Sequence, residues 1–410
     1  MSTAAPADVA AAADDANSFG AIVRERWEAL KAGDVGSLPV IVGIIAITIF
    51  FTTKTSIFFS AVNFTNLIGQ MAGVTVIATG VVFVLLIGEI DLSVAFLSGV
   101  AGVVVAEMQR PDSNHHYPGL VAIGLAILAG VVIGMLQGSV IALIGVPSFV
   151  VTLAGLLIWQ GVILKDLGTQ GVIGIQDKQV NDVANYVLSK TTGWIVAAVF
   201  AFGLLAAAGG TWFNRRRAGL PTGNPVIVAL RVVFYGGLAF AAVAVCNHSR
   251  GVPLVGLIVL FVVVLWSYVA GRTTFGRHVY AVGGNAEAAR RAGINVKLIR
   301  ILVFMISGGM AGLGGVILAS RLNSVDLTAG GSTLLLDAIS AAVIGGVSLF
   351  GGRGRVSGAL FGGLIIGMIS NGIDLVGYTD AVKYITTGLI LLAAVTLDTV
   401  ARRRQAAVGR

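Results

Sequence analysis

The sequence predicts an all-α polytopic membrane protein, a transmembrane helical bundle of about 10–12 spans with broken helices and one short cytoplasmic helix. Three observations support this class. Of the 410 residues, 56% are hydrophobic and 11% are charged, whereas about a quarter of the residues in a soluble domain carry charge. The 56 glycines suit the close approach of helices inside a bilayer. Long stretches contain no acidic or basic residue, among them 55–88, 113–164 and 251–271.

The apolar runs define the predicted spans, because a helix needs roughly 20 apolar residues to cross the hydrocarbon core. A spanning backbone must also satisfy its own hydrogen bonds, which selects helices. Some runs are interrupted by glycine, and we expect these to be half-helices that meet at a break. In chain order the runs lie at 38–59, 66–88, 92–108, 119–145, 147–168, 193–212, 226–246, 254–271, 299–320, 333–350, 356–376 and 380–400.

Three segments follow from this pattern. Residues 1–36 are predicted to form a cytoplasmic tail, because they are rich in Ala, Asp and Ser and lack the basic start and apolar core of a signal peptide. Residues 37–400 form the transmembrane domain, in which 272–298 is the largest cytoplasmic loop. Residues 401–410 are predicted to form a basic cytoplasmic tail.

The distribution of Lys and Arg predicts that both termini lie in the cytoplasm. With the N-terminus inside, most of the 27 Lys and Arg residues fall in inner segments. The net charge of +8 is then explained by topology and by attraction to anionic lipid. Because the basic residues are scattered over many loops, we expect no nucleic-acid partner. The predicted location is the plasma (inner) membrane.

The charged island "EAARRAG" in the loop 272–298 predicts a short helix. Asn285, two residues before this motif, is a good N-cap, and Gly293 at its end is a natural C-terminal stop. The alanines between them are strong helix formers. Two turns, about 12 Å, are not stable alone, so the spans or another protein must hold the helix. It is either a solvated connector or a docking helix for a cytoplasmic partner. Its residues are Asn285, Glu287, Ala288, Ala289, Arg290, Arg291 and Gly293.

The stretch "GEIDLS" places two carboxylates between apolar runs. Charges at membrane depth are expensive and mark function. The alternative is a position at the cytoplasmic surface, or capping of the following helix by Asp91 or Ser93. The candidate residues are Gly88, Glu89, Asp91, Leu92 and Ser93.

The stretch "IGGVSLFGGRGRVSG" is rich in glycine and predicts a bend that frees backbone groups toward a cavity or a neighbouring helix. Its candidate residues are Gly345, Gly346, Ser348, Gly351 and Gly352.

Taken together, these motifs resemble the ABC importer permeases of the ribose/xylose type. "EAARRAG" is similar to the loop that inserts into a cleft of the ATP-hydrolysing subunit. "IGEIDLSVAFLSG" resembles the family's "GGIDLSVGS", with Glu89 in place of the second glycine and Ala95-Phe96 in place of Gly-Ser. Residues 338–373 resemble the "IGGTSLxGGxG" region. The resemblance covers nearly all of 60–400, and the extra pair of spans at 193–246 looks most like the xylose-type permeases.

The resemblance implies a translocation path for a monosaccharide, with a xylose-like pentose favoured. It implies a homodimer or paired permease, a cytoplasmic ABC ATPase subunit and an extracytoplasmic sugar-binding protein. The chain contains no G-x-x-x-x-G-K-[ST] motif. We therefore expect no enzyme activity, no catalytic residue and no cofactor in this chain, with ATP and Mg bound by the partner ATPase. The adjacent pair His115 and His116 is a poor metal site, and no metal is expected.

A sugar path needs hydrogen-bonding groups and aromatic faces rather than fixed charges. The candidates are Trp159, Gln160, Asn323 and Asn371. For each of them, helix packing or a place at the membrane interface is the alternative.

Other classes of protein make different demands on the sequence. An ion-coupled secondary transporter of a small polar solute needs ionisable groups in its spans, and these are few here. A membrane-embedded enzyme needs a catalytic cluster at one membrane face, and the sequence contains none. Composition alone does not distinguish a channel from a transporter.

Overall fold

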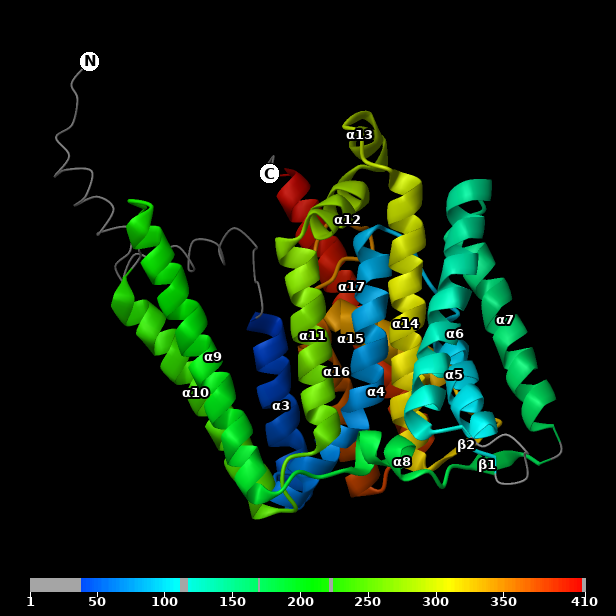
Figure 1. The fold of residues 1–410 in the computed structure, drawn as a ribbon, viewed down its shortest axis with the longest axis horizontal. Helices are drawn as coiled ribbons and strands as arrows, with labels where there is room; N and C mark the ends of the chain where they lie inside the picture. Colours follow the sequence, from blue (N-terminus) through cyan, green and yellow to red (C-terminus); the bar gives the residue numbers. More distant parts are fainter. Residues whose placement is uncertain (1–37, 111–116, 169, 221–223, 408–410) are drawn as a thin grey trace. The chain divides into compact units, whose positions relative to one another are not determined.

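The computed structural model describes residues 38–110, 117–168, 170–220 and 224–407 (Figure 1). The predicted N-terminal tail, the pair His115 and His116, and residues 408–410 lie outside the described part. Contacts divide the chain into two compact units. The segment 188–252 belongs to the first unit, and 37–187 with 253–400 forms the second.

Every predicted span contains a helix, so the prediction of an all-α fold is confirmed. Among the described residues, 8 helices are long and apolar enough to cross a membrane, and shorter apolar helices accompany them. The predicted basic tail begins inside the last helix. The helices of the spans are α3 (Leu38–Lys54), α4 (Ala61–Leu86), α5 (Val94–Met108), α6 (Gly119–Ser139) with the π-helical turn η1 (Val140–Ile144), α7 (Ser148–Leu167), α9 (Lys190–Arg217), α10 (Pro225–His248), α11 (Leu254–Arg272), α14 (Val296–Leu322), α15 (Ser332–Ile344), α16 (Gly358–Val376) and α17 (Asp380–Ala407).

Short elements cover the two ends of the second unit. α12 (Thr274–Gly284) and α13 (Ala286–Arg291) lie at one end, and α8 (Lys178–Asn185) lies at the other (Figure 1). Beside α8, the strands β1 (Val172–Gly174) and β2 (Ser324–Asp326) pair antiparallel, with Ile173 opposite Val325. These two ends are called the α13 end and the α8 end.

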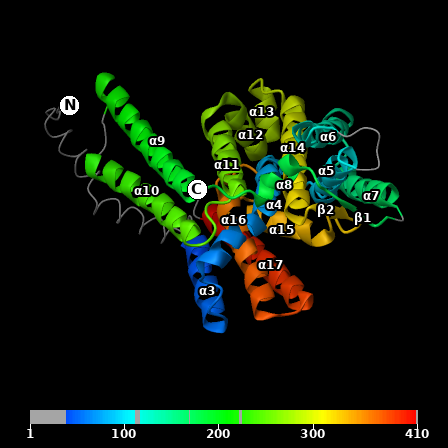
Figure 2. The ribbon, with the colours of Figure 1, turned by 60° about the horizontal axis from the view of Figure 1, so that its bottom comes forward.

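α14 is the central helix of the second unit and packs against α4, α5 and α6. It lies between α4 and α6 in both views of the ribbon (Figures 1 and 2). The approach to α6 is close because glycines face each other: a methyl group on Gly130 would overlap the carbonyl oxygen of Gly308, and a methyl group on Gly308 would overlap that of Gly130. Helices in bilayers associate through such small residues, which let the backbones touch.

The first unit contains a helical hairpin of α9 and α10. The ring of Trp194 stacks on that of Phe240, with 6.0 Å between the centroids. At the neck of the hairpin, the Leu188 N–H donates to the Val252 carbonyl (2.9 Å). Many of its large apolar side chains are exposed, as expected for helices that face lipid.

Candidate coupling and translocation site

The short helix α13 is capped at both ends as the sequence predicts. The Asn285 side chain accepts a hydrogen bond from the Ala288 N–H (2.9 Å). At the other end, Gly293 adopts a φ of 86°, the left-handed conformation that glycine tolerates best. Its N–H donates to the Arg290 carbonyl (3.0 Å), and the Ile294 N–H donates to the Ala289 carbonyl (3.1 Å). This pair of bonds is the Schellman arrangement, which satisfies the last carbonyls of a helix.

One side of α13 is anchored in the protein. Ala289 is buried and belongs to the same apolar cluster as Val279 of α12 and Ile299 of α14. The partly buried Ala286 and Ile294 pack against that cluster. The chain's own core therefore holds this helix, which is too short to be stable alone.

The other side of α13 presents charge. Glu287 accepts hydrogen bonds from Arg290 (2.5 Å) and Arg291 (3.1 Å), and all of these side chains are exposed. The bonds from Arg290 and then Arg291 lower the pKa of the Glu287 carboxyl below its usual value. Because exposed ion pairs add little stability, this face is available for a partner without loss of the fold.

Backbone contacts join α12, the helix that precedes α13, to two of the sequence motifs. The end of α12, the end of α4 and the glycine-rich loop after α15 meet at what we call the glycine junction, formed by Leu86, Gly88, Gly283, Gly351 and Gly352. The Gly352 N–H donates to the Leu86 carbonyl (2.8 Å). A methyl group on Gly283 would overlap that carbonyl and lie 2.7 Å from the Gly352 nitrogen. Gly351 and Gly352 have φ values of 82° and 72°, so side chains are disfavoured there by both space and conformation.

A side chain reinforces the junction. The Tyr280 hydroxyl of α12 donates to the Gly354 carbonyl (2.8 Å). Burial raises the pKa of this hydroxyl, although Arg355 acts in the opposite direction, so Tyr280 remains a neutral donor at physiological pH. The predicted residues Gly88, Gly351 and Gly352 thus lie beside the helix that leads into α13. Gly345 has a different contact, since a methyl group there would overlap the Gly358 carbonyl at the start of α16.

Glu89, whose role the sequence leaves open, forms an ion pair with Arg300 (3.1 Å). The Glu89 side chain is 15% exposed and the Arg300 side chain 32%. Arg300 lies in the second turn of α14, directly after the α13 segment. The carboxylate therefore ties the "GEIDLS" segment to the start of the central helix.

Asp91 is buried and lies deeper in the unit than Glu89. It accepts hydrogen bonds from the Ser93 N–H (3.0 Å), the Ser93 hydroxyl (2.7 Å) and the Ser307 hydroxyl (2.9 Å). Ser307 is about 16 Å along α14 from Val296, at 1.5 Å per residue. Ser93 takes the N-cap position of α5, but its side chain makes no capping bond to the helix. Its hydroxyl lies 3.1 Å from the Gln137 Oε1 atom instead.

The sequence reasoning missed a second segment that has the same local geometry. Between β2 and α15, the N–H and the hydroxyl of Thr328 donate to Asp326 Oδ1 at 2.8 and 2.7 Å. The signal is a repeated tripeptide, D-L-S at 91–93 and D-L-T at 326–328. The first segment starts from the α13 end and the second from the α8 end.

Each of these segments leads into a half-helix. α5 and α15 contain 15 and 13 residues, about 22 and 20 Å at 1.5 Å per residue, short of the roughly 30 Å hydrocarbon core. Their starts are side by side, since a methyl group on Gly330 would overlap the Ala95 carbonyl and lie 2.7 Å from the Phe96 Cα. Two helix N-termini, which carry partial positive charge, therefore meet inside the bundle. Broken helices of this kind form the solute sites of many transporters.

Two buried N–H groups near this point have no acceptor in the described part of the chain. They are the Gln137 Nε2 and Trp159 Nε1 atoms. Both surround Gly155 of α7: a methyl group there would overlap Gln137 Nε2 and lie 3.3 Å from Trp159 Nε1. A buried donor without an acceptor is expensive, so these two groups are candidate donors to a hydroxyl oxygen. Gln160 is partly exposed on the same helix.

The structure does not bring the four candidate path residues together. Asn371 of α16 and Asn63 of α4 exchange hydrogen bonds between their amides (2.8 and 2.9 Å), and Asn371 also donates to Gln70 (3.0 Å). Asn323 ends α14 with a φ of 52°, and its side chain accepts from Asn185 (3.1 Å). The side chains of these two asparagines therefore hydrogen-bond to neighbouring helices, and their place on a solute path stays a prediction.

The described residues contain no group of three His, Cys, Asp or Glu side chains that could hold a metal ion.

Comparison with known proteins gives a family and several relatives. The family model described as "Branched-chain amino acid transport system / permease component" matches residues 63–395. A xylose transport system permease protein of Escherichia coli (strain K12) is 36% identical over 408 residues, covering 98% of this chain and 100% of the relative. One from Haemophilus influenzae is 34% identical, covering 90% and 98%. A ribose import permease protein of Escherichia coli (strain K12) is 32% identical, covering 87% and 92%. No solved structure matches the chain.

Proposed function

The chain belongs to this permease family, and from that premise we propose that it is the membrane subunit of an ABC importer that forms the path for a monosaccharide. A xylose-like pentose is the favoured cargo. The full-length similarity to a xylose transport system permease protein supports this choice.

The observation that carries the proposal is the construction of α13, which is buried on one side at Ala289 and charged and exposed on the other. No nucleotide-binding motif occurs in the sequence, so energy from ATP must enter through an interface. We assign that interface to Glu287, Arg290 and Arg291. A partner ATPase that pushes on α13 acts on α14 through the chain that follows, and on α4 through the glycine junction.

We expect this movement to be transmitted to the half-helices α5 and α15. Asp91 is bonded to Ser307 of α14, so a movement of α14 relative to α4 reaches the start of α5. The two segments that carry D-L-S and D-L-T start from opposite ends, as alternating access requires of the two gates of a path. Gln137 and Trp159 are the donors that we assign to the sugar hydroxyls.

The surroundings of the chain follow from the same proposal. The α13 end faces the cytoplasm and both termini lie there, in the plasma (inner) membrane. A second permease chain, identical or related, completes the path, and a sugar-binding protein docks at the opposite end. ATP and Mg bind to the partner ATPase. No catalytic residue, cofactor or nucleic-acid contact is assigned to this chain.

The test of energy coupling is uptake of labelled xylose by cells that carry the whole transport system. We expect ATP depletion to stop uptake and a protonophore that leaves ATP intact to spare it. Uptake that survives ATP depletion and collapses with the protonophore would instead favour an ion-coupled transporter. Uptake of ribose but not xylose would keep the permease and change the cargo.

The test of the interface is purification of the chain in mild detergent with its bound subunits. We expect an ATPase to co-purify, to be lost in Glu287→Arg and to be retained in Asp182→Arg. Asp182 is a matched control because it is another carboxylate in an i,i+4 ion pair, with Lys178, at the α8 end. Equal recovery of the ATPase with both variants would remove Glu287 from the interface.

A further inference from the structure

The α9–α10 hairpin is strongly basic. α9 ends in Arg215, Arg216 and Arg217, and α10 carries Arg231. The sequence between Asp182 and Glu287 contains no acidic residue. The hairpin therefore cannot neutralise its own arginines.

Two of the four arginines make cation–π contacts with aromatic rings about one turn earlier on the same helix. The Arg216 guanidinium lies 5.2 Å from the centre of the Trp212 ring, and Arg217 lies 4.6 Å from that of Phe213. Arg215 and Arg231 form no ion pair with any residue that the structure describes. Instead they line a common pocket.

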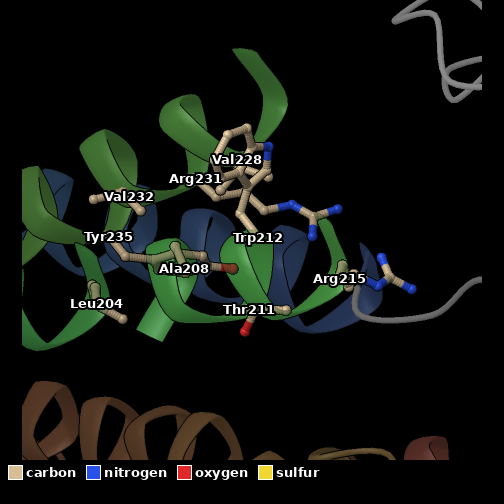
Figure 3. Close-up of a pocket in the computed structure, with 9 residues that line it drawn as sticks. All are labelled: Leu204, Ala208, Thr211, Trp212, Arg215, Val228, Arg231, Val232 and Tyr235. Carbon is tan, nitrogen blue, oxygen red and sulfur yellow. The ribbon is translucent and has the colours of Figure 1, made fainter. Parts of the chain in front are cut away.

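This pocket lies between the two helices and has a volume of about 340 Å³. Besides the two arginines it is lined by Trp212 and Tyr235, and most of the remaining wall is apolar, as at Leu204. In Figure 3 the guanidinium groups of Arg215 and Arg231 extend toward the same end of the pocket, and Leu204 lies at the opposite end. The pocket is thus basic at one end and apolar at the other.

The depth of these groups matches the edge of a bilayer. α9 has 28 residues, about 42 Å, which exceeds the roughly 30 Å hydrocarbon core, so its last turns reach the headgroups. Arg231 is about 9 Å from the start of α10, and Leu204 is about 16 Å from Arg215 along α9. Trp and Tyr are enriched at this level of a membrane. Arginines near the ends of spanning helices extend to this interface, where they attract anionic headgroups.

We propose that this pocket binds the headgroup of an anionic phospholipid, with the phosphate between Arg215 and Arg231 and an acyl chain along the apolar wall toward Leu204. The chemistry required is a phosphate-type anion attached to an apolar chain, and the bilayer supplies it. The Lys and Arg distribution predicts that Arg215, Arg216 and Arg217 lie on the cytoplasmic side, so the lipid belongs to the inner leaflet. The site does not depend on which solute the protein transports.

The experiment is native mass spectrometry of the full chain, purified in mild detergent and exposed to equal amounts of phosphatidylglycerol and phosphatidylethanolamine. We expect enrichment of bound phosphatidylglycerol. Arg215→Gln and Arg231→Gln should each reduce the enrichment about fivefold, the effect of one basic residue near an anionic surface. Arg217→Gln is the matched control, since it removes the same charge from the same helix end but lies outside the pocket. It should leave the enrichment nearly unchanged.

Three results would overturn the proposal. Equal loss in Arg217→Gln and Arg231→Gln would show general attraction of lipid to a basic helix end. Equal retention of the two lipids by the unaltered chain would show no headgroup selection. Displacement of phosphatidylglycerol by millimolar inorganic phosphate would show a site for a free anion. Folding is controlled by the elution volume of each variant, and a variant that aggregates is replaced by the Lys substitution at the same position, which keeps the charge and should retain the lipid.

Discussion

The close packing at the glycine junction allows us to predict the effect of the substitution Gly283→Ala. In Gly283→Ala the new methyl carbon overlaps the Leu86 carbonyl oxygen, whereas real Cβ atoms essentially never come within 3.0 Å of a neighbour. The ends of α12 and α4 must therefore separate by roughly 1 Å, with loss of the 2.8 Å bond from the Gly352 N–H to Leu86. Overpacking and one lost buried hydrogen bond together cost about 2–4 kcal/mol.

The functional effect should exceed the loss of stability. Because α12 leads directly into α13, a displaced α12 misplaces the proposed docking face. In enzymes, a shift of about 1 Å caused by a distant mutation can lower the rate about 100-fold, and we expect a smaller but clear effect on coupling. We expect ATP-driven sugar uptake in proteoliposomes to fall at least 10-fold, while the chain still inserts and elutes as a folded protein.

The neighbouring glycine supplies the control for this experiment. A methyl group on Gly284 meets nothing within 4 Å, so Gly284→Ala makes the same chemical change at the next residue without a clash. Its uptake and thermal stability should match the unaltered chain. If Gly283→Ala behaved as Gly284→Ala does, the close contact would carry neither stability nor coupling, and the reasoning would be refuted.

Further predictions concern the charged residues of the site. Glu89→Gln should destabilise the chain by about 1 kcal/mol, since Arg300 is partly exposed and water weakens the ion pair. A double-mutant cycle with Arg300→Gln should show a coupling energy of that size. Additive effects of the two substitutions on the free energy of unfolding would contradict the ion pair. Asp91→Ala leaves the Ser307 hydroxyl and the Ser93 N–H without their acceptor, at about 1–3 kcal/mol each, whereas Asp91→Asn keeps one acceptor oxygen and should lower the unfolding temperature less. Because the pKa of Glu287 is lowered, its charge is kept as pH falls through the usual value of 4.5 and its ion pairs weaken only below that; ATPase co-purification should therefore be constant from pH 7 to 5, and a loss near pH 6 would point to another group.

The sequence predicts the spans well because the cause is local: an uninterrupted apolar run of sufficient length has few alternatives to a membrane helix. The caps of α13 are predictable for the same reason. Asn285 and Gly293 act on backbone groups within a few residues of themselves, through propensities that do not depend on the rest of the fold.

The parts that were missed depend on contacts between distant segments. The glycine-rich stretch predicts the bend after which α15 ends at Ile344, but it does not predict that the following loop meets Leu86. The partnership of Glu89 with Arg300 joins residues far apart in the chain, and no local pattern encodes it. The same holds for Asn371, whose amide is satisfied by α4. The repeat of D-L-S in D-L-T was visible in the sequence, but three residues in an apolar chain carry little weight until both segments are seen to precede half-helices.

The two ends of the α9–α10 hairpin lie close together, which bears on how the hairpin could be inserted or deleted during evolution. Leu188 is bonded to Val252, and the next residues outward, Val187 and Pro253, form an isolated β-bridge. The chain thus departs and returns through two adjacent, hydrogen-bonded segments, so a very short turn could close the gap if the hairpin were excised. Insertions with adjoining ends are the kind that a fold tolerates. The hairpin could therefore be gained or lost by recombination as a single insertion, together with its basic residues.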